Sequence, residues 1–140
     1  MISLVTAKVI RANAQYAYKL KGQGEKYLVE HNDNESASDK IVEYLTPYAV
    51  YGCPVQVESV AVQKKSEILI GNHEDCPIFK CCVRGMETDV DGKSRKFQRR
   101  YFAQAIDPIE AIAMVQEAFE DTACEYEILS VAKTNIIEIK

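Results

Sequence analysis

Residues 101–139 read YFAQAIDPIEAIAMVQEAFEDTACEYEILSVAKTNIIEI, and their pattern occurs once before, beginning at Tyr27. The two segments share turn, helix and strand residues in the same order, with a short length difference in one loop. The matched pairs are Asp33 with Asp107, Ala37 with Ala111, Ile41 with Val115, Leu45 with Phe119, Cys53 with Cys124, 59–61 with 130–132, and 67–68 with 138–139. We interpret this as an internal duplication that sets the architecture.

The first half is predicted to contain two strands, a helix and a third strand that resumes through a bulge. The expected ranges are 4–19, 26–30, a helix ending near Thr46, 55–62 and 67–70. Gly22 and Gly24 suit a hairpin turn between the first two strands. Either Asp33 or Ser36 can cap the helix, and the match with Asp107 favours Asp33. Its predicted buried stripe is Ile41, Tyr44, Leu45 and Tyr48.

The second half repeats this plan. Strands are expected at 78–87 and 95–106 around a turn at 89–92, and a last strand at 125–139 with a kink near residues 134–135. Asp107 can cap the intervening helix, Pro108 suits its first position, and Glu110 completes a capping-box-like pair. Its predicted apolar face is Ala111, Ile112, Val115, Ala118 and Phe119.

These patterns predict an α+β fold made of two strand–strand–helix–strand repeats, at about 4–70 and 78–139, within a single domain of residues 1–140. A half of this size buries too small a share of its surface to be self-sufficient. We therefore expect the halves to share one core under pseudo-two-fold symmetry, with helices packed on antiparallel sheet. The pattern leaves one sheet or two open.

Composition excludes several classes of protein. The net charge of −4 predicts no general attraction to nucleic acid or to an anionic membrane. The first residues lack the basic start and apolar run of a signal peptide, and no segment has the length of an apolar membrane span. Five cysteines without framework spacing fit a reducing compartment. We expect a soluble, intracellular protein with no membrane partner.

A metal site has only weak candidate ligands: His73, Cys76 and Cys81. Cys82 would point to the other face of a strand through residues 79–83, so it could not join Cys81 at one ion. No CxxC pair occurs in the chain. We therefore expect no metal and no cofactor, and cysteines that act as small apolar side chains.

Catalytic motifs are also missing from the sequence. A cysteine nucleophile would have only His31 or His73 as its base. The chain contains neither a glycine-rich phosphate loop nor a Gly-x-Ser-x-Gly elbow. We expect a protein that is not an enzyme and has no catalytic residues.

The densest basic run is the strongest candidate site. It combines five cations with two aromatic residues: Lys93, Arg95, Lys96, Phe97, Arg99, Arg100 and Tyr101. This combination suits phosphate neutralisation and base stacking, so nucleic-acid binding is one hypothesis. On a strand, however, Phe97, Arg99 and Tyr101 would share one face and Lys96, Gln98 and Arg100 the other. The alternative is an exposed hairpin whose charges protect a strand edge.

Several short motifs stand out at 27–29, 46–48, 65–68, 79–81, the turn before Lys96, and 126–128 with Val131. With these motifs the chain resembles an uncharacterised family of short proteins encoded by Bacteroidetes-type gut bacteria and their phages, known only as a domain of unknown function. The resemblance covers the chain from about Thr6 to Ile139. It implies no activity, but it implies a phage or mobile-element origin.

Function is therefore unknown from sequence. The leading hypothesis is a non-enzymatic protein-binding or adaptor module, whose exposed sheet edges suit pairing with an unknown protein partner or self-association. The alternatives are a nucleic-acid-binding protein that uses the basic hairpin at 93–101, and a phage structural component.

Overall fold

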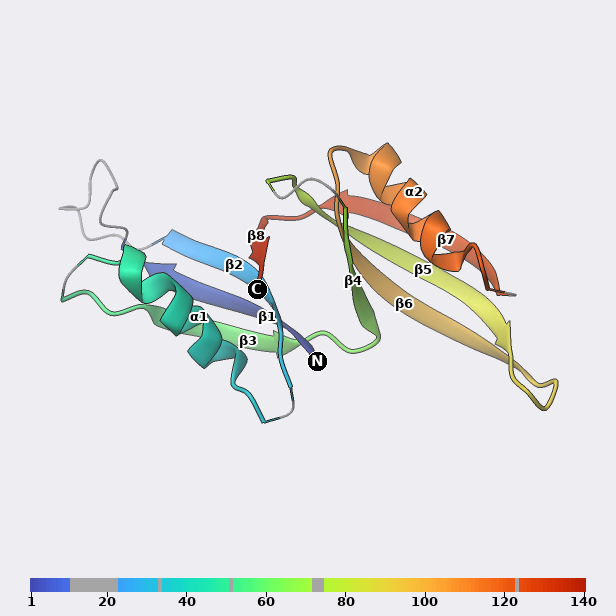
Figure 1. Cartoon of the computed structure of the whole chain (residues 1–140), viewed down its shortest axis with the longest axis horizontal. Coiled ribbons are helices and arrows are strands. Elements are labelled where there is room, and N and C mark those ends of the chain that lie inside the picture. Colours follow the sequence, from blue (N-terminus) through green and yellow to red (C-terminus); the bar gives the residue numbers. More distant parts are fainter. Residues whose placement is uncertain (11–22, 33, 51, 72–74, 123) are drawn as a thin grey trace. The chain divides into compact units, whose positions relative to one another are not determined.

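The computed structural model describes residues 1–10, 23–32, 34–50, 52–71, 75–122 and 124–140 (Figure 1). These residues form a mixed α+β fold, as predicted. The elements are β1 (Ile2–Val9), β2 (Gln23–Glu30), α1 (Ala37–Leu45), the 3-10 helix η2 (Thr46–Tyr48), β3 (Gln56–Val62), β4 (Ser66–Ile70), β5 (Ile78–Thr88), β6 (Ser94–Gln104), α2 (Pro108–Phe119), β7 (Glu125–Lys133) and β8 (Ile136–Ile139). For the predicted strand at 4–19, the part at 11–19 lies outside the described residues, as does Gly22.

The strands form two four-stranded sheets, in the orders β3-β1-β2-β8 and β4-β6-β5-β7. The sheets belong to two compact units, residues 1–64 with 136–140, and residues 65–135. Each unit also contains one α-helix, α1 or α2. The strand pairs are antiparallel except β2 with β8 and β4 with β6, which are parallel. The predicted antiparallel sheet is therefore correct only for three strands of each sheet.

The fourth strand of each sheet comes from the other half of the sequence. β4 follows β3 in the chain but pairs with β6, and β8 follows β7 but pairs with β2. The prediction that residues 67–70 continue the third strand through a bulge is wrong. Lys65 adopts a left-handed conformation with φ 53°, which ends one strand and redirects the chain into the next. Near residues 134–135, where a kink was expected, the chain likewise leaves one sheet for the other, because β7 ends at Lys133 and β8 starts at Ile136.

The strand pairing around one central tyrosine is alike in the two sheets. Tyr27 pairs with Val5 on one side and Glu138 on the other. Tyr101 pairs likewise with Cys81 and Glu67.

Each sheet also contains an irregularity in the strand after its helix. In β3, Ser59 pairs with Thr6 and Val57 with Ala7, so Glu58 is the extra residue. In β7, Ser130 pairs with Cys82 and Ile128 with Val83, so Leu129 is the extra residue. Each extra residue directly precedes a Ser-Val-Ala sequence.

Helix α1 starts from Ser36, whose hydroxyl accepts a hydrogen bond from the Asp39 N–H at 3.3 Å. The preference for Asp33 as the cap is thus not followed, and Asp33 itself lies outside the described residues. Ile41 and Leu45 are buried as predicted. Tyr48 is 49% exposed, because it lies in the 3-10 turn after the helix, where the side-chain period changes from 3.6 to about 3.

Helix α2 has the predicted start. The Asp107 carboxylate accepts a hydrogen bond from the Glu110 N–H at 2.8 Å, and the Glu110 carboxylate accepts one from the Ile106 N–H at 3.4 Å. Pro108 occupies the first turn. The buried face consists of Ala111, Val115 and Phe119, with Ile112 partly buried. Ala118 is exposed, contrary to the prediction.

The buried residues form two clusters, which differs from the expected single shared core. The α1 side of the first sheet contributes Val5, Ala7, Val9, Tyr27, Val29, Ala37, Ile41 and Leu45. The α2 side of the second sheet contributes Phe79, Cys81, Val83, Tyr101, Ala103, Ala105, Ala111, Val115 and Phe119. Each helix thus closes the core of its own sheet.

Aromatic contacts concentrate on Phe119 in the second cluster. Its ring stacks on Tyr126 at a centroid distance of 4.3 Å and on Phe97 at 6.1 Å, and it meets Tyr101 edge-on at 5.7 Å. Such ring pairs contribute about 0.5–1.5 kcal/mol each beyond their buried area. Phe119 therefore ties α2 to both β6 and β7.

We expect Gly85→Ala to lower the free energy of unfolding by about 1–3 kcal/mol, measured by urea denaturation. A Cβ at residue 85 would collide with the Glu125 carbonyl oxygen and lie 2.7 Å from Cζ of Phe97. Gly24→Ala is the matched control, because its Cβ would meet nothing closer than 3.7 Å. Equal stability of the two variants would contradict this account of Phe97 packing over Gly85.

Candidate functional site

The basic run lies on the hairpin formed by β5 and β6, whose turn is the one predicted at 89–92. The Asp89 carboxylate accepts hydrogen bonds from the N–H groups of Asp91 and Lys93 at 3.0 and 2.9 Å. Gly92 has φ 80°, a left-handed conformation that glycine adopts without strain. The local sequence thus fixes the turn and with it the register of the two strands.

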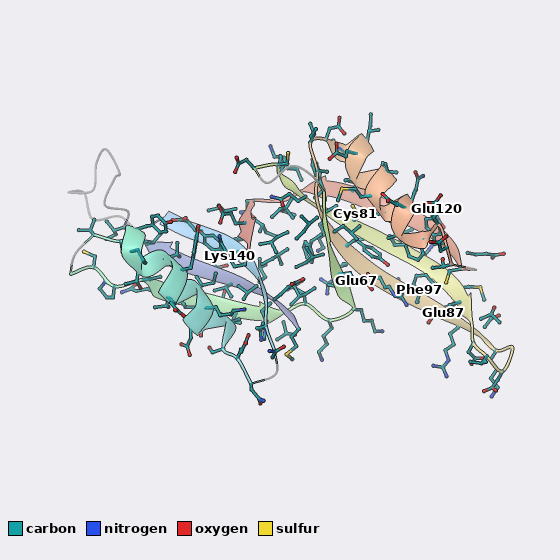
Figure 2. All side chains as sticks on the ribbon, in the orientation of Figure 1. Glu67, Cys81, Glu87, Phe97, Glu120 and Lys140 are labelled. Carbon is teal, nitrogen blue, oxygen red and sulfur yellow. The ribbon has the colours of Figure 1, made fainter. Side chains whose placement is uncertain are left out.

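One face of this run supports the core. The Phe97 and Tyr101 rings pack against Phe119, and Tyr101 is 2% exposed. The Arg99 guanidinium lies 4.7 Å from the Phe97 ring centroid and 3.3 Å from a Glu87 carboxylate oxygen (Phe97 and Glu87 are labelled in Figure 2). Burial raises the pKa of Tyr101, although Arg99 opposes this. The two rings proposed for base stacking are therefore occupied by packing contacts.

The opposite face of the hairpin forms a groove of about 760 Å³. Its lining combines cations, two acidic residues and a few apolar groups: Lys65, Arg84, Gly85, Met86, Lys96, Phe97, Gln98, Glu125, Tyr126 and Glu127. Arg84 is held by Glu127 at 3.2 Å. The basic side of the groove is formed by β6 and the acidic side by β7.

The basic run also forms a strand edge with only one neighbour. β4 pairs with β6 only from Arg100 to Gln104, whereas β5 pairs with it from Ser94 onward. Figure 1 shows the β5–β6 hairpin extending beyond β4. Within the described part of the chain, no strand pairs with residues 94–99 on the β4 side. We call this segment the β6 open edge.

Two backbone hydrogen bonds that flank residues 94–99 show which backbone groups point outward. The Lys93 carbonyl accepts from Asp89 across the hairpin, and the Arg100 N–H donates to the Lys65 carbonyl on the β4 side. Because alternate residues of a strand direct their backbone groups to opposite edges, Ser94, Lys96 and Gln98 present their N–H and C=O groups outward. The open edge therefore offers three donors and three acceptors.

Cations surround this edge. Lys93, Arg95 and Lys96 are exposed, and Lys65 stands where β4 begins. Among the described residues, no salt bridge involves Lys65, Lys93, Arg95 or Lys96. Arg100 is partly buried and has an interaction of its own. Of the five cations in the basic run, Lys93, Arg95 and Lys96 are therefore the ones that can contact a ligand without giving up another interaction.

Of the weak metal candidates, the structure describes Cys76 and Cys81, which lie in different environments. His73 lies outside the described residues. Cys76 is partly buried, and its carbonyl accepts from Gln104 at 3.4 Å. Cys81 is fully buried beneath α2, and Cys82 points to the opposite face, as predicted. In the part of the chain that the structure describes, no group of three His, Cys, Asp or Glu side chains could hold a metal ion.

We expect Cys81 to make the protein less stable at alkaline pH. Burial raises the pKa of its thiol to about 11 from an ordinary value of 9.0. The unfolded chain therefore releases this proton first, so stability present below pH 9.0 is lost as the pH rises toward 11. The loss amounts to about 2–3 kcal/mol at most.

Urea denaturation across this pH range measures the effect, and Cys81→Ala should remove that part of the pH dependence. Cys53→Ala, at a partly buried cysteine of the other unit, is the control. A Cys81→Ala variant with the same pH slope as the unmodified protein would contradict the prediction.

Ser3 and His31 form a side-chain pair that sequence reasoning missed. The pair lies where β2 ends and the chain leads into α1. The Ser3 Oγ is 2.8 Å from Nε2 of His31, whose Nδ1 is 3.1 Å from the Asn32 carbonyl oxygen. A carbonyl oxygen only accepts, so Nδ1 carries a proton, and in the neutral ring Nε2 then accepts from the Ser3 hydroxyl. The two residues are 28 positions apart, and only the pairing of β1 with β2 brings them together.

This geometry resembles an activated serine, but burial opposes that role. Ser3 is 0% exposed, so a substrate carbonyl has no path to its hydroxyl. The nearby carboxylate, Glu35, bonds to the Asn32 N–H at 3.4 Å. That hydrogen bond and the Lys40 ammonium lower the pKa of Glu35. The pair is best explained as hydrogen bonding that satisfies a buried hydroxyl.

We expect Ser3→Ala to lower the free energy of unfolding by about 0.5–1.5 kcal/mol, the net value of one hydrogen bond. Ser130→Ala, at an exposed position of β7, should have a smaller effect. A fluorophosphonate probe should leave the folded protein unlabelled. Labelling that disappears in Ser3→Ala would show that the serine is reactive.

These features define a small α+β protein with a basic, open strand edge. A family model described as Domain of unknown function (DUF4494) matches residues 6–140, and the chain belongs to this family. The match agrees with the predicted membership of a family of unknown function. No curated protein matches the chain, and no solved structure does. Neither described helix is long and apolar enough to cross a membrane.

Proposed function

We propose that this protein is a non-enzymatic protein-binding module that captures an extended segment of a partner protein by strand pairing. The observation that carries the proposal is the β6 open edge. Its outward backbone groups at Ser94, Lys96 and Gln98 continue the edge that β4 covers from Arg100 onward. An added strand would lie beside residues 94–99, in line with β4.

Strand addition suits this edge for an energetic reason. Each backbone hydrogen bond contributes about 0.5–1.5 kcal/mol net, and several in a row give affinity without requiring a deep pocket. The edge is preorganised, because β5 pairs with every residue of β6. Binding therefore costs little conformational entropy on the side of this protein.

The alternative explanation of the cations is protection of the edge against aggregation. The two roles are compatible. Like charges repel a second basic edge, yet they leave the backbone groups available to a partner of suitable charge. The proposal therefore favours a distinct partner over self-association through β6.

We also propose that the two units descend from a duplicated segment. The support is the same strand order, the matching pairs around Tyr27 and Tyr101, and an extra residue at Glu58 and at Leu129. We further propose that a pseudo-two-fold axis relates the two repeats. We also propose a phage or mobile-element origin and a location in the bacterial cytoplasm. The origin rests on the family resemblance alone.

The test uses Gln98→Pro, which removes one outward N–H without changing charge. Proline is tolerated at an edge position whose N–H faces away from the sheet. Gln98→Thr is the matched control, because threonine keeps the N–H and favours strands. Peptides selected against the unmodified protein from a displayed random library should bind the Thr variant normally and the Pro variant at least about tenfold more weakly, the equivalent of about 1.4 kcal/mol.

Amide hydrogen exchange supplies the second measurement. The amides of Ser94, Lys96 and Gln98 should exchange quickly in the free protein and become protected in the complex. Selected peptides that bind both variants equally and protect none of these amides would refute strand pairing at β6. A nucleic-acid partner would give a different result: binding insensitive to Gln98→Pro, with an affinity that falls steeply with salt.

A further inference from the structure

We infer that the segment captured by the β6 open edge is acidic, with carboxylates on both of its faces. This inference rests on the proposed function and adds the chemical class of the partner. It follows from the charges on either side of the path that an added strand would take.

On the face away from α2, the added strand would lie beside Lys96, with Lys65 at the end of its path. Both side chains line the groove, and no salt bridge neutralises either one among the described residues. Neighbouring strands lie about 4.8 Å apart, so a carboxylate at the facing position is within reach of a lysine side chain.

On the α2 face, the strand would lie beside Arg95 and Arg99. Arg95 is exposed and has no salt bridge among the described residues. The Arg99 guanidinium forms a salt bridge with a Glu87 carboxylate oxygen at 3.3 Å and lies over the Phe97 ring. A guanidinium held in place by a ring loses less side-chain entropy when it meets a carboxylate. Because Glu87 and Glu67 already act on Arg99, Arg95 is the cation that favours an acidic residue on this face.

The acidic residues of the groove do not cancel this field. Glu125 and Glu127 lie on β7, which β5 separates from β6. They are therefore about 10 Å from β6 and farther still from an added strand. That distance exceeds the screening length of about 8 Å at physiological ionic strength. Glu127 is in addition paired with Arg84 at 3.2 Å. No acidic residue occurs in β6 itself.

The experiment compares three short, end-blocked peptides of alternating sequence: Glu with Val, Gln with Val, and Lys with Val. Fluorescence anisotropy should give the order acidic, neutral, basic in affinity, with the acidic peptide binding at least about tenfold more tightly than the neutral one at low salt. Alternation matters because successive strand residues face opposite sides. A fourth peptide with paired Glu and paired Val residues places carboxylates on both faces and should bind most tightly.

The charge variants Lys65→Gln, Arg95→Gln and Lys96→Gln keep every backbone group of the edge. Each should weaken the acidic peptide about two- to fivefold and leave the neutral peptide unchanged. Lys133→Gln is the matched control, since Lys133 is an exposed lysine on β7, away from the β6 open edge. It should change neither affinity.

The possible failures are distinguishable. Equal binding of acidic and neutral peptides, both weakened by Gln98→Pro, would overturn the inference about charge while leaving strand pairing intact. Binding of the acidic peptide that Gln98→Pro does not weaken would overturn the proposed function, and so would the absence of binding by any peptide. Oligothymidylate that binds more tightly than every peptide and loses affinity in the three charge variants would assign the cations to nucleic acid instead.

Discussion

The parallel pairing of β4 with β6 and of β8 with β2 is the constraint on which the rest of the structure depends. Each sheet obtains its fourth strand from the other half of the sequence, so neither half can complete its own sheet. The chain consequently crosses between the units at Lys64–Lys65 and again at Asn135–Ile136. Deleting either half of the sequence would remove a strand from the sheet that the other half mostly forms, so the folding of the two sheets is coupled through the covalent chain. The open edge has the same origin, because β4 begins only at Ser66 and leaves the outer half of β6 with one neighbour.

Strand β6 performs two tasks with alternate residues. Phe97 and Tyr101 turn toward α2 and pack around Phe119, which joins the helix to the sheet. Lys96 and Gln98 line the groove on the opposite face, and their backbone groups point to the open edge. One strand can carry this division because its side chains alternate with a period of two. The packing face holds the strand in place, which would lower the entropic cost of the proposed recognition at its edge.

Sequence reasoning was most successful where the signal is local. The cap at Asp107, the turn closed by Asp89 and the buried stripe of α2 each depend on residues within one helical turn or one hairpin. It failed where partners are distant. Residues 67–70 look like a continuation of β3, and only their pairing with β6 shows otherwise. Tyr101 in the basic run looked available for stacking until its contact with Phe119 was known. The contact between Ser3 and His31 had no local signal at all.

The sequence by itself determined which segments become helices and strands, where the hairpin turns, and how the cations alternate along β6. These properties follow from capping, from turn geometry and from side-chain periodicity, all of which act over a few residues. Only the tertiary structure decided which strand pairs with which, that the sheets exchange β4 and β8, and that the basic run has an open edge. Strand pairing joins residues far apart in the chain through backbone groups that are the same in every residue, so side-chain identity alone does not specify it.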